Sequence, residues 1–193
     1  MYNIFIVNKV TMQQTHGNNV VVVSKKDIGN KIPNCDGLIT NDSNITLVVK
    51  TADCLPISII DHNNNVISLV HAGWRGLENK IVISAINILL DKFKSDPTTL
   101  KVLVGPHICQ KHYEVQKDVY SVFESIPNAI KNDNGKFYLS LFNVLKEELL
   151  SLGILSKNIT VDLRCTFENK LLPSYRRGDR NKRIVTTLNI KSS

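Results

Sequence analysis

A cysteine and a histidine bracket a stretch of chain that the sequence predicts to be a β-hairpin. Cys54 comes just before an apolar run at 55–61, and His71 comes just after a second run at 66–70. The four residues between the runs, His-Asn-Asn-Asn, are typical of a turn. Cys54 and His71 are therefore expected to meet at the open end of the hairpin. There they could bind a soft transition metal together, or the histidine could activate the thiol as a nucleophile.

A third candidate ligand lies near the N-terminus. His16 stands in the segment Gln-Thr-His-Gly, just ahead of an expected strand. With Cys54 and His71 it forms a Cys-His-His set, and catalytic zinc characteristically has three protein ligands and an open fourth position for water. The spacing of the three matches no local zinc motif, so residue types alone leave a packing cysteine and surface histidines as the alternative. By default, Cys35 and Cys165 are interpreted as structural.

Two basic segments are candidates for binding an anion. Arg75 stands between Gly73 and Gly76 at an expected strand-to-helix turn, where free backbone amides favour an anion, although a plain tight turn is the alternative. The segment 176–183 holds five basic residues and one Asp. Three interpretations of this segment are open. It could be a solvated tail or a nucleic-acid contact, or its first two residues, Arg176 and Arg177, could face the substrate. Nucleic acid is the minor option, because no aromatic residues are interleaved and no RNA or DNA module is recognisable.

The composition is that of an ordinary globular chain. Of its 193 residues, 42% are hydrophobic and 21% are charged, which argues against a disordered or fibrous protein. The longest apolar run, 81–90, is too short and too interrupted for a membrane helix, which needs about 20 residues. The N-terminus lacks the basic segment and cleavage site of a secretion signal, and the four cysteines show no CxxC spacing. We therefore expect a cytoplasmic protein with free thiols and no membrane contact.

The periodicity of apolar residues predicts strands early in the chain and helices mixed in later. Because there is no regular alternation of strand and helix, no internal repeat and no linker, we expect a single α+β domain over residues 1–193. The expected strands span 4–7, 20–24, 38–40, 46–50, 55–61, 66–70, 101–104, 159–163 and 183–189, and the expected helices span 77–94, 117–125 and 139–152.

Seven motifs occur in the order found in the multicopper polyphenol oxidoreductase family, also called the laccase-domain family: QTHGNNV, CDGLIT, TADCLPI, HAGWRGL, GPHICQKHYEV, DLRCT and SYRR. The chain resembles this family over about residues 13–189, and the pair TADCLP and HAGWRG is highly specific to it. Members are regarded as purine nucleoside phosphorylases with adenosine deaminase activity. The resemblance implies a mixed sheet with flanking helices in α/β/α-type layers. It also implies bound zinc, with copper as an alternative, and purine nucleosides and phosphate as substrates.

The resemblance also assigns the metal ligands. The family uses the His of its Q-x-H-G motif, the Cys of TADC and the His of HAGW, which match His16, Cys54 and His71 in this chain. The implied reactions are phosphorolysis of adenosine, inosine or methylthioadenosine to the free base and the sugar 1-phosphate, and deamination of adenosine.

Further site residues are expected from the chemistry of these reactions. Deamination needs an acid that carries a proton to the leaving ammonia, and Asp53, next to the candidate ligand in the chain, and Asp36 are the expected acids. Phosphorolysis needs phosphate held facing C1′ of the sugar, and Arg75 with Arg176 or Arg177 is expected to hold it.

The chain departs from the family pattern in three places. It begins fifteen residues before His16, so the arginine of an upstream Ser-x-Arg-x-Gly-Gly segment has no counterpart. Either another basic residue replaces that arginine, or substrate range and rate differ. Cys35 stands where an alanine is expected, and His107 stands where a small apolar residue is expected. His107 is interpreted as a further polar contact with the substrate.

Three other functions are weighed against this one. A cysteine hydrolase or deamidase would use Cys54 as nucleophile and His71 as base. A copper-dependent polyphenol oxidase ranks next, because one Cys-His-His centre holds too few metals for four-electron reduction of dioxygen. Binding of RNA by the basic segment 176–183 ranks last. The preferred nucleoside, the choice between zinc and copper, and the oligomeric state are left open.

Overall fold

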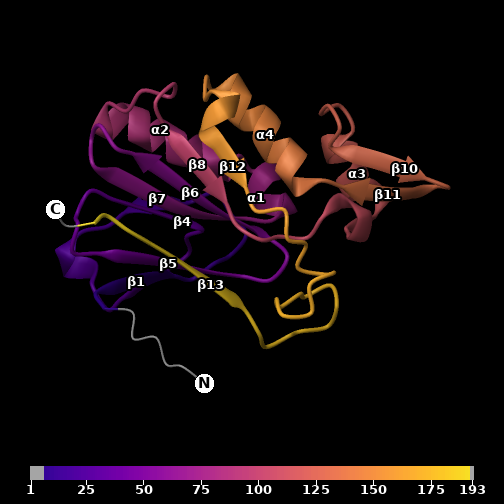
Figure 1. The fold of residues 1–193 in the computed structure, drawn as a ribbon, viewed down its shortest axis with the longest axis horizontal. Coiled ribbons are helices and arrows are strands. Elements are labelled where there is room, and N and C mark those ends of the chain that lie inside the picture. The colour runs from indigo at the N-terminus through magenta and orange to yellow at the C-terminus, as the bar shows by residue number, and fades with distance from the viewer. Residues whose placement is uncertain (1–6, 192–193) are drawn as a thin grey trace.

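Two mixed β-sheets form the frame of the molecule (Figure 1). The computed structural model describes residues 7–191. In spatial order, the larger sheet consists of β12 (Ile159–Val161), β8 (Lys101–Val104), β6 (Leu55–Asp61), β7 (Val66–Ala72), β4 (Gly37–Thr40) and β2 (Val20–Val22). The smaller sheet consists of β13 (Ile184–Asn189), β5 (Thr46–Thr51), β1 (Lys9–Met12) and β3 (Lys31–Ile32). Each sheet contains both parallel and antiparallel neighbours.

Helices cover one face of the larger sheet (Figure 1). They are α1 (Trp74–Glu78), α2 (Ile81–Phe93) and α4 (Leu141–Ser151). The apolar stripe of α2 includes Ile81, Ala85 and Leu89, which are fully buried in one cluster with Ile57 of β6 and Val70 of β7. This recurrence every four residues places one helix face against the sheet and explains why the segment is helical.

The smaller sheet covers the opposite face of the larger one. Leu47 and Val49 of β5 pack in a second buried cluster with Ile67 and Leu69 of β7. The expected α+β class with mixed sheets is therefore confirmed, but the layers run helix, sheet, sheet instead of α/β/α. The physical reason is that strand β7 is buried along its whole length, so both of its faces need an apolar cover.

The predicted hairpin is confirmed. Strands β6 and β7 pair antiparallel from Leu55 opposite Ala72 to Asp61 opposite Val66. The strand predicted at 4–7 falls almost wholly outside the described residues, and the first described strand is β1, at Lys9–Met12.

The prediction of one helix over 77–94 is wrong, because the chain forms two helices there. Lys80 adopts a left-handed backbone conformation (φ 63°) between α1 and α2. Its Nζ atom donates to Oε1 of the buried Glu148 at 2.8 Å, so a contact with α4 holds the break. Apolar periodicity runs on through Lys80 and carries no sign of this interruption.

A small third sheet lies beside α3 (Lys117–Phe123) and has no counterpart among the predicted elements. It consists of β9 (Glu114–Val115), β10 (Ile130–Asp133) and β11 (Lys136–Leu139). Because β11 extends to Leu139, the helix predicted from residue 139 starts at Leu141. The Ser140 side chain accepts from the Asn143 amide and caps this helix. Within residues 7–191, no helix combines the length and the apolar character that crossing a bilayer requires.

Candidate functional site

The structure brings together three residues, His16, Cys54 and His71, which we call the Cys54 trio. Cys54 directly precedes β6, and Pro56, two residues later, pairs with His71 of β7. One side-chain ligand atom from each residue lies within 4.8 Å of the other two, and the two imidazole rings meet edge to face with centroids 4.7 Å apart. This donor set could hold a metal ion.

A buried carboxylate fixes the orientation of His71. Asp36 precedes β4, whose Gly37 pairs with Val70 of β7, so Asp36 lies opposite His71. The His71 amide donates to the Asp36 carbonyl oxygen at 2.7 Å, and His71 Nδ1 lies 2.7 Å from Asp36 Oδ1. Because Nδ1 is occupied by the carboxylate, Nε2 is the His71 nitrogen left for a ligand contact.

The same carboxylate also holds the loop that carries His16. The backbone amides of Thr15, His16 and Gly17 donate to the Asp36 oxygens at 2.9, 3.0 and 3.0 Å. Burial alone would raise the pKa of Asp36, but the bonds from His71 and from these amides hold that pKa well below its usual range. Asp36 is therefore an ionised carboxylate with no exposed surface, and it organises two of the three candidate ligands.

A glycine leaves the space in front of the trio open. A Cβ atom on Gly73 would lie 2.9 Å from Cys54 Sγ and 3.3 Å from His16 Cδ2, both too close. Glycine at this position therefore has a steric reason that the turn alone would not supply.

The Cys54 thiol ionises more readily than an ordinary thiol. Burial would raise its pKa, but hydrogen bonds with His16 and His71 outweigh that effect and lower the pKa to about 7. A thiolate is the form that binds a metal and also the form that attacks as a nucleophile. The thiol therefore suits both chemistries expected from the sequence.

The trio opens into a cavity of about 750 Å³. Within the part of the chain that the structure describes, five basic side chains and one carboxylate, that of Asp53, line its walls, so cations outnumber acids there. Three aromatic side chains, Trp74, Tyr113 and Tyr175, also line it. The basic residues are Lys31, Lys50, Arg75, Arg176 and Arg183. Such a cavity suits an anion together with a ligand that has a flat apolar part.

Asp53 connects the cavity to the long loop between β12 and β13 (residues 162–183), here called the C-terminal loop. It is almost fully buried, and its backbone is held at a positive φ of 85°. Its carboxylate accepts from Thr166 Oγ1 at 2.6 Å and from the Arg176 amide at 2.7 Å. These bonds bring two segments that are distant in the chain to the wall of one cavity.

Two arginines of the cavity wall are held by aromatic rings. The Arg75 guanidinium carbon lies 4.2 Å from the centre of the Trp74 ring, and that of Arg176 lies 5.1 Å from the centre of the Tyr113 ring. Arg176 also donates to the Glu114 carbonyl oxygen at 2.9 Å. Both guanidinium groups are thus oriented before any ligand arrives.

Three of the residues expected in the site do not line this cavity. Arg177 uses its guanidinium within the C-terminal loop, where it donates to Asp179 and to carbonyl oxygens that include those of Thr166 and Phe167. His107 is buried, and its Nδ1 lies 2.9 Å from the Gly105 carbonyl oxygen. Asp36 lies behind the trio, on the side away from the cavity walls.

Three cavity-lining cations, Lys31, Lys50 and Arg183, were not singled out from the sequence. Lys31 is in β3 and Lys50 is in β5, two strands of the smaller sheet. Arg183 directly precedes β13, whose first residue pairs with Thr51 of β5. Its place in a basic segment was a signal in the sequence, and the pairing of β13 with β5 brings Arg183 itself to the site.

The arrangement can be compared with known proteins. Residues 3–191 match the family described as multi-copper polyphenol oxidoreductase laccase. A purine nucleoside phosphorylase of Rickettsia prowazekii is 32% identical over 195 residues, which cover 93% of this chain and 77% of that protein. One of Aquifex aeolicus is 34% identical over 153 residues, which cover 79% and 69%. The crystal structure of YlmD from Geobacillus stearothermophilus superposes with a TM-score of 0.90 at 26% identity, covering 96% of this chain and 74% of that one. With this match over nearly its whole length, the chain belongs to the multi-copper polyphenol oxidoreductase laccase family.

Proposed function

We propose that this protein is a purine nucleoside phosphorylase, which cleaves the bond between base and sugar with inorganic phosphate. The observation that carries the proposal is the cavity itself, which among residues 7–191 is lined by the Cys54 trio, five cations and one carboxylate. Its volume of about 750 Å³ is suitable for a nucleoside together with phosphate. The relatives that bear the name purine nucleoside phosphorylase support the same reaction.

In this reaction a phosphate oxygen forms a bond to C1′ of the sugar while the bond from C1′ to the purine nitrogen breaks. The electron pair of the broken bond leaves with the base, and positive charge develops on the sugar. Arg75 and Arg176 would hold the phosphate, because a guanidinium fork matches two phosphate oxygens. Stacking on Trp74 and Tyr113 keeps both forks in place, so little conformational freedom is lost on binding.

Asp53 and Asp36 take different roles in this proposal. Asp53 lines the cavity and bonds the Arg176 amide, so it positions that arginine and is the carboxylate available to a substrate. Asp36 has no exposed surface and bonds His71, so it acts as a positioning residue. Its placement favours this role over the proton transfer that was expected from the sequence.

The Cys54 trio fits a zinc ion. Two imidazoles and a readily ionised thiol are typical zinc ligands, and copper is the alternative that the same donors admit. Gly73 keeps the space at Cys54 Sγ free of side-chain atoms, and Asp36 orients His71 as carboxylates do behind metal-bound histidines. A zinc ion held here would supply a Lewis acid. It would also lower the pKa of a bound water, so that hydroxide is available at neutral pH.

Adenosine deamination is proposed as a second activity of the same cavity. In this reaction an oxygen of water forms a bond to C6 of the purine while the bond from C6 to the amino nitrogen breaks. Within the described residues, Asp53 is the one carboxylate on the cavity walls, and it would carry a proton from the attacking water to the leaving ammonia. Adenosine, inosine and methylthioadenosine are the proposed substrates for phosphorolysis, and adenosine is the substrate for deamination.

The test is phosphate-dependent release of base from inosine and adenosine, with ammonia release from adenosine followed in parallel. We expect base release to require phosphate, and Arg75→Ala to raise the KM for phosphate. Base release that proceeds equally well without phosphate would contradict phosphorolysis.

A cysteine hydrolase is the second candidate, because the lowered pKa of Cys54 beside His71 also suits a nucleophile. Removal of metal by a chelator separates the two functions. The phosphorylase loses activity and regains it with zinc, whereas the hydrolase retains activity and is inactivated when Cys54 is alkylated.

A further inference from the structure

A second group of metal-binding side chains lies outside the cavity. Cys109, Cys165 and Glu168, here called the Cys109 cluster, each have a ligand atom within 4.8 Å of the other two. None of the three lines the cavity. A tetrahedral zinc ion with bonds of about 2.3 Å sets its ligand atoms roughly 3.8 Å apart, so the cluster needs only small shifts to close on such an ion.

Backbone contacts between two loops hold the thiols together. The first loop follows β8 and the second follows β12, and they join in a parallel bridge between His107 and Cys165. The Thr166 amide donates to the His107 carbonyl oxygen at 3.0 Å, and the Cys109 amide donates to Cys165 Sγ at 3.2 Å. Backbone contacts therefore hold the two sulfur atoms close together.

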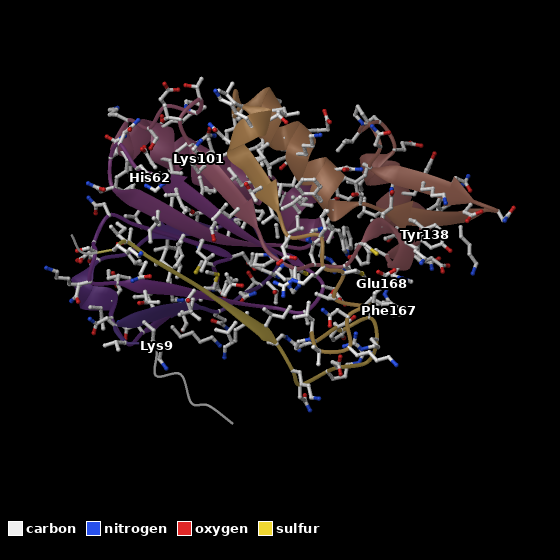
Figure 2. All side chains as sticks on the ribbon, viewed as in Figure 1. Lys9, His62, Lys101, Tyr138, Phe167 and Glu168 are labelled. Carbon is white, nitrogen blue, oxygen red and sulfur yellow. The ribbon has the colours of Figure 1, made fainter. Side chains whose placement is uncertain are left out.

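The carboxylate of the cluster is oriented as well. His112 Nε2 lies 2.9 Å from Glu168 Oε1, and the His112 ring stacks on Phe167 with centroids 4.5 Å apart. In Figure 2 the labelled Phe167 and Glu168 lie where the C-terminal loop approaches the third sheet, that of β9, β10 and β11. Carboxylates that bind a metal ion are themselves hydrogen-bonded by neighbouring groups, as Glu168 is here by His112. Glu168 is half exposed, so solvent can reach a fourth coordination position.

We propose that Cys109, Cys165 and Glu168 bind a second divalent metal ion, zinc by the chemistry of the donors. Two cysteine sulfur ligands favour zinc over magnesium or calcium, which take oxygen ligands. The ion links the loop of Cys109 to the loop of Cys165. Thr166 follows Cys165 in the chain and donates to Asp53, which lines the cavity, so this link stabilises one wall of the cavity from outside. The proposal does not depend on the reaction that the cavity performs.

The test measures zinc in a full-length chain whose Cys54 trio is disabled by His16→Ala and Cys54→Ser. After dialysis against micromolar zinc and removal of free metal, elemental mass spectrometry is expected to find one zinc per chain. Adding Cys109→Ser removes that zinc, while His112→Ala weakens its binding by about tenfold. Glu124→Gln, an exposed acid elsewhere on the surface, is the matched control and retains the zinc.

A second readout does not depend on stoichiometry. Cobalt loaded into the disabled chain is expected to show a thiolate-to-cobalt absorption band that disappears in Cys109→Ser. Cys165 is buried and its replacement could unfold the loop, so the half-buried Cys109 and the exposed Glu168 are the better positions to change. The proposal is overturned if the disabled chain binds no zinc, if Cys109→Ser retains the zinc and the band, or if Cys109 and Cys165 form a disulfide in the freshly isolated protein.

Discussion

The Cys54 trio and the Cys109 cluster each bring cysteine sulfur together with other metal-binding side chains, but they are built differently. His71 lies within a strand, and the fully buried Asp36 holds both His71 and the loop of His16. The Cys109 cluster lies on two loops, and the side chain of its Glu168 is 50% exposed. The trio lines the cavity of about 750 Å³, whereas no residue of the Cys109 cluster lines that cavity. From this contrast we infer that metal-binding side chains alone do not mark a catalytic centre, and that a buried support behind them and a cavity in front do.

Loss of the thiol from the trio is expected to have the largest effect. Cys54→Ser should reduce nucleoside phosphorolysis to background and remove the metal of the trio, because a serine hydroxyl is a poor ligand for zinc. The measurement is turnover of inosine together with metal content. Cys109→Ser is the comparison, and its turnover should fall far less. Equal losses in the two variants would erase the distinction between the regions.

Removal of the charge behind His71 comes next. Asp36→Asn retains the shape of the side chain but leaves His71 without an anionic partner, so metal affinity or activity should fall by about 10–100-fold. Metal titration and turnover measure the effect. Asp61→Asn is the matched control, since Asp61 is equally buried but accepts its bonds from Asn63 and Asn64 in the hairpin turn. It should lower thermal stability and leave metal affinity unchanged.

The sequence predicted that Cys54 and His71 lie close together, but it did not predict the supporting role of Asp36 behind His71. Turn residues between two apolar runs predicted the hairpin, and the hairpin alone brings Cys54 next to His71. The role of Asp36 depends on the antiparallel pairing of β4 with β7, which no local pattern reveals. Arg183 reaches the cavity only because β13 pairs with β5, a strand more than a hundred residues earlier in the chain. Long-range pairing of strands is therefore the part of the fold that composition and periodicity do not specify.

A methyl group placed beside the trio should have an intermediate effect. Gly73→Ala puts a Cβ atom 2.9 Å from Cys54 Sγ, so Cys54 or His16 must shift and metal affinity should fall by about tenfold, from strain of about 1–3 kcal/mol. Gly17→Ala in the same region meets its nearest atom at an ordinary 3.5 Å and is the control. Isothermal titration with zinc compares the two variants, and an unchanged affinity in Gly73→Ala would show that the trio is more adaptable than its geometry indicates.

The smallest effect is expected at the rim of the cavity. Arg183→Ala removes one exposed cation and should raise the KM for phosphate by about fivefold, with little change in kcat. Arg180→Ala is the control, because Arg180 stacks on Tyr175 and does not line the cavity. If the two variants behave alike in steady-state kinetics, the basic segment contributes only general charge.

The central claim is that the Cys54 trio is the metal site of a phosphate-dependent nucleoside enzyme. Inosine turnover, measured before and after chelation and again after zinc is restored, tests this claim most directly in wild type and in Cys54→Ser. We predict that wild type loses phosphate-dependent turnover on chelation and recovers it with zinc, whereas Cys54→Ser is inactive throughout. Metal-free wild type that cleaves inosine at the full rate would contradict the claim.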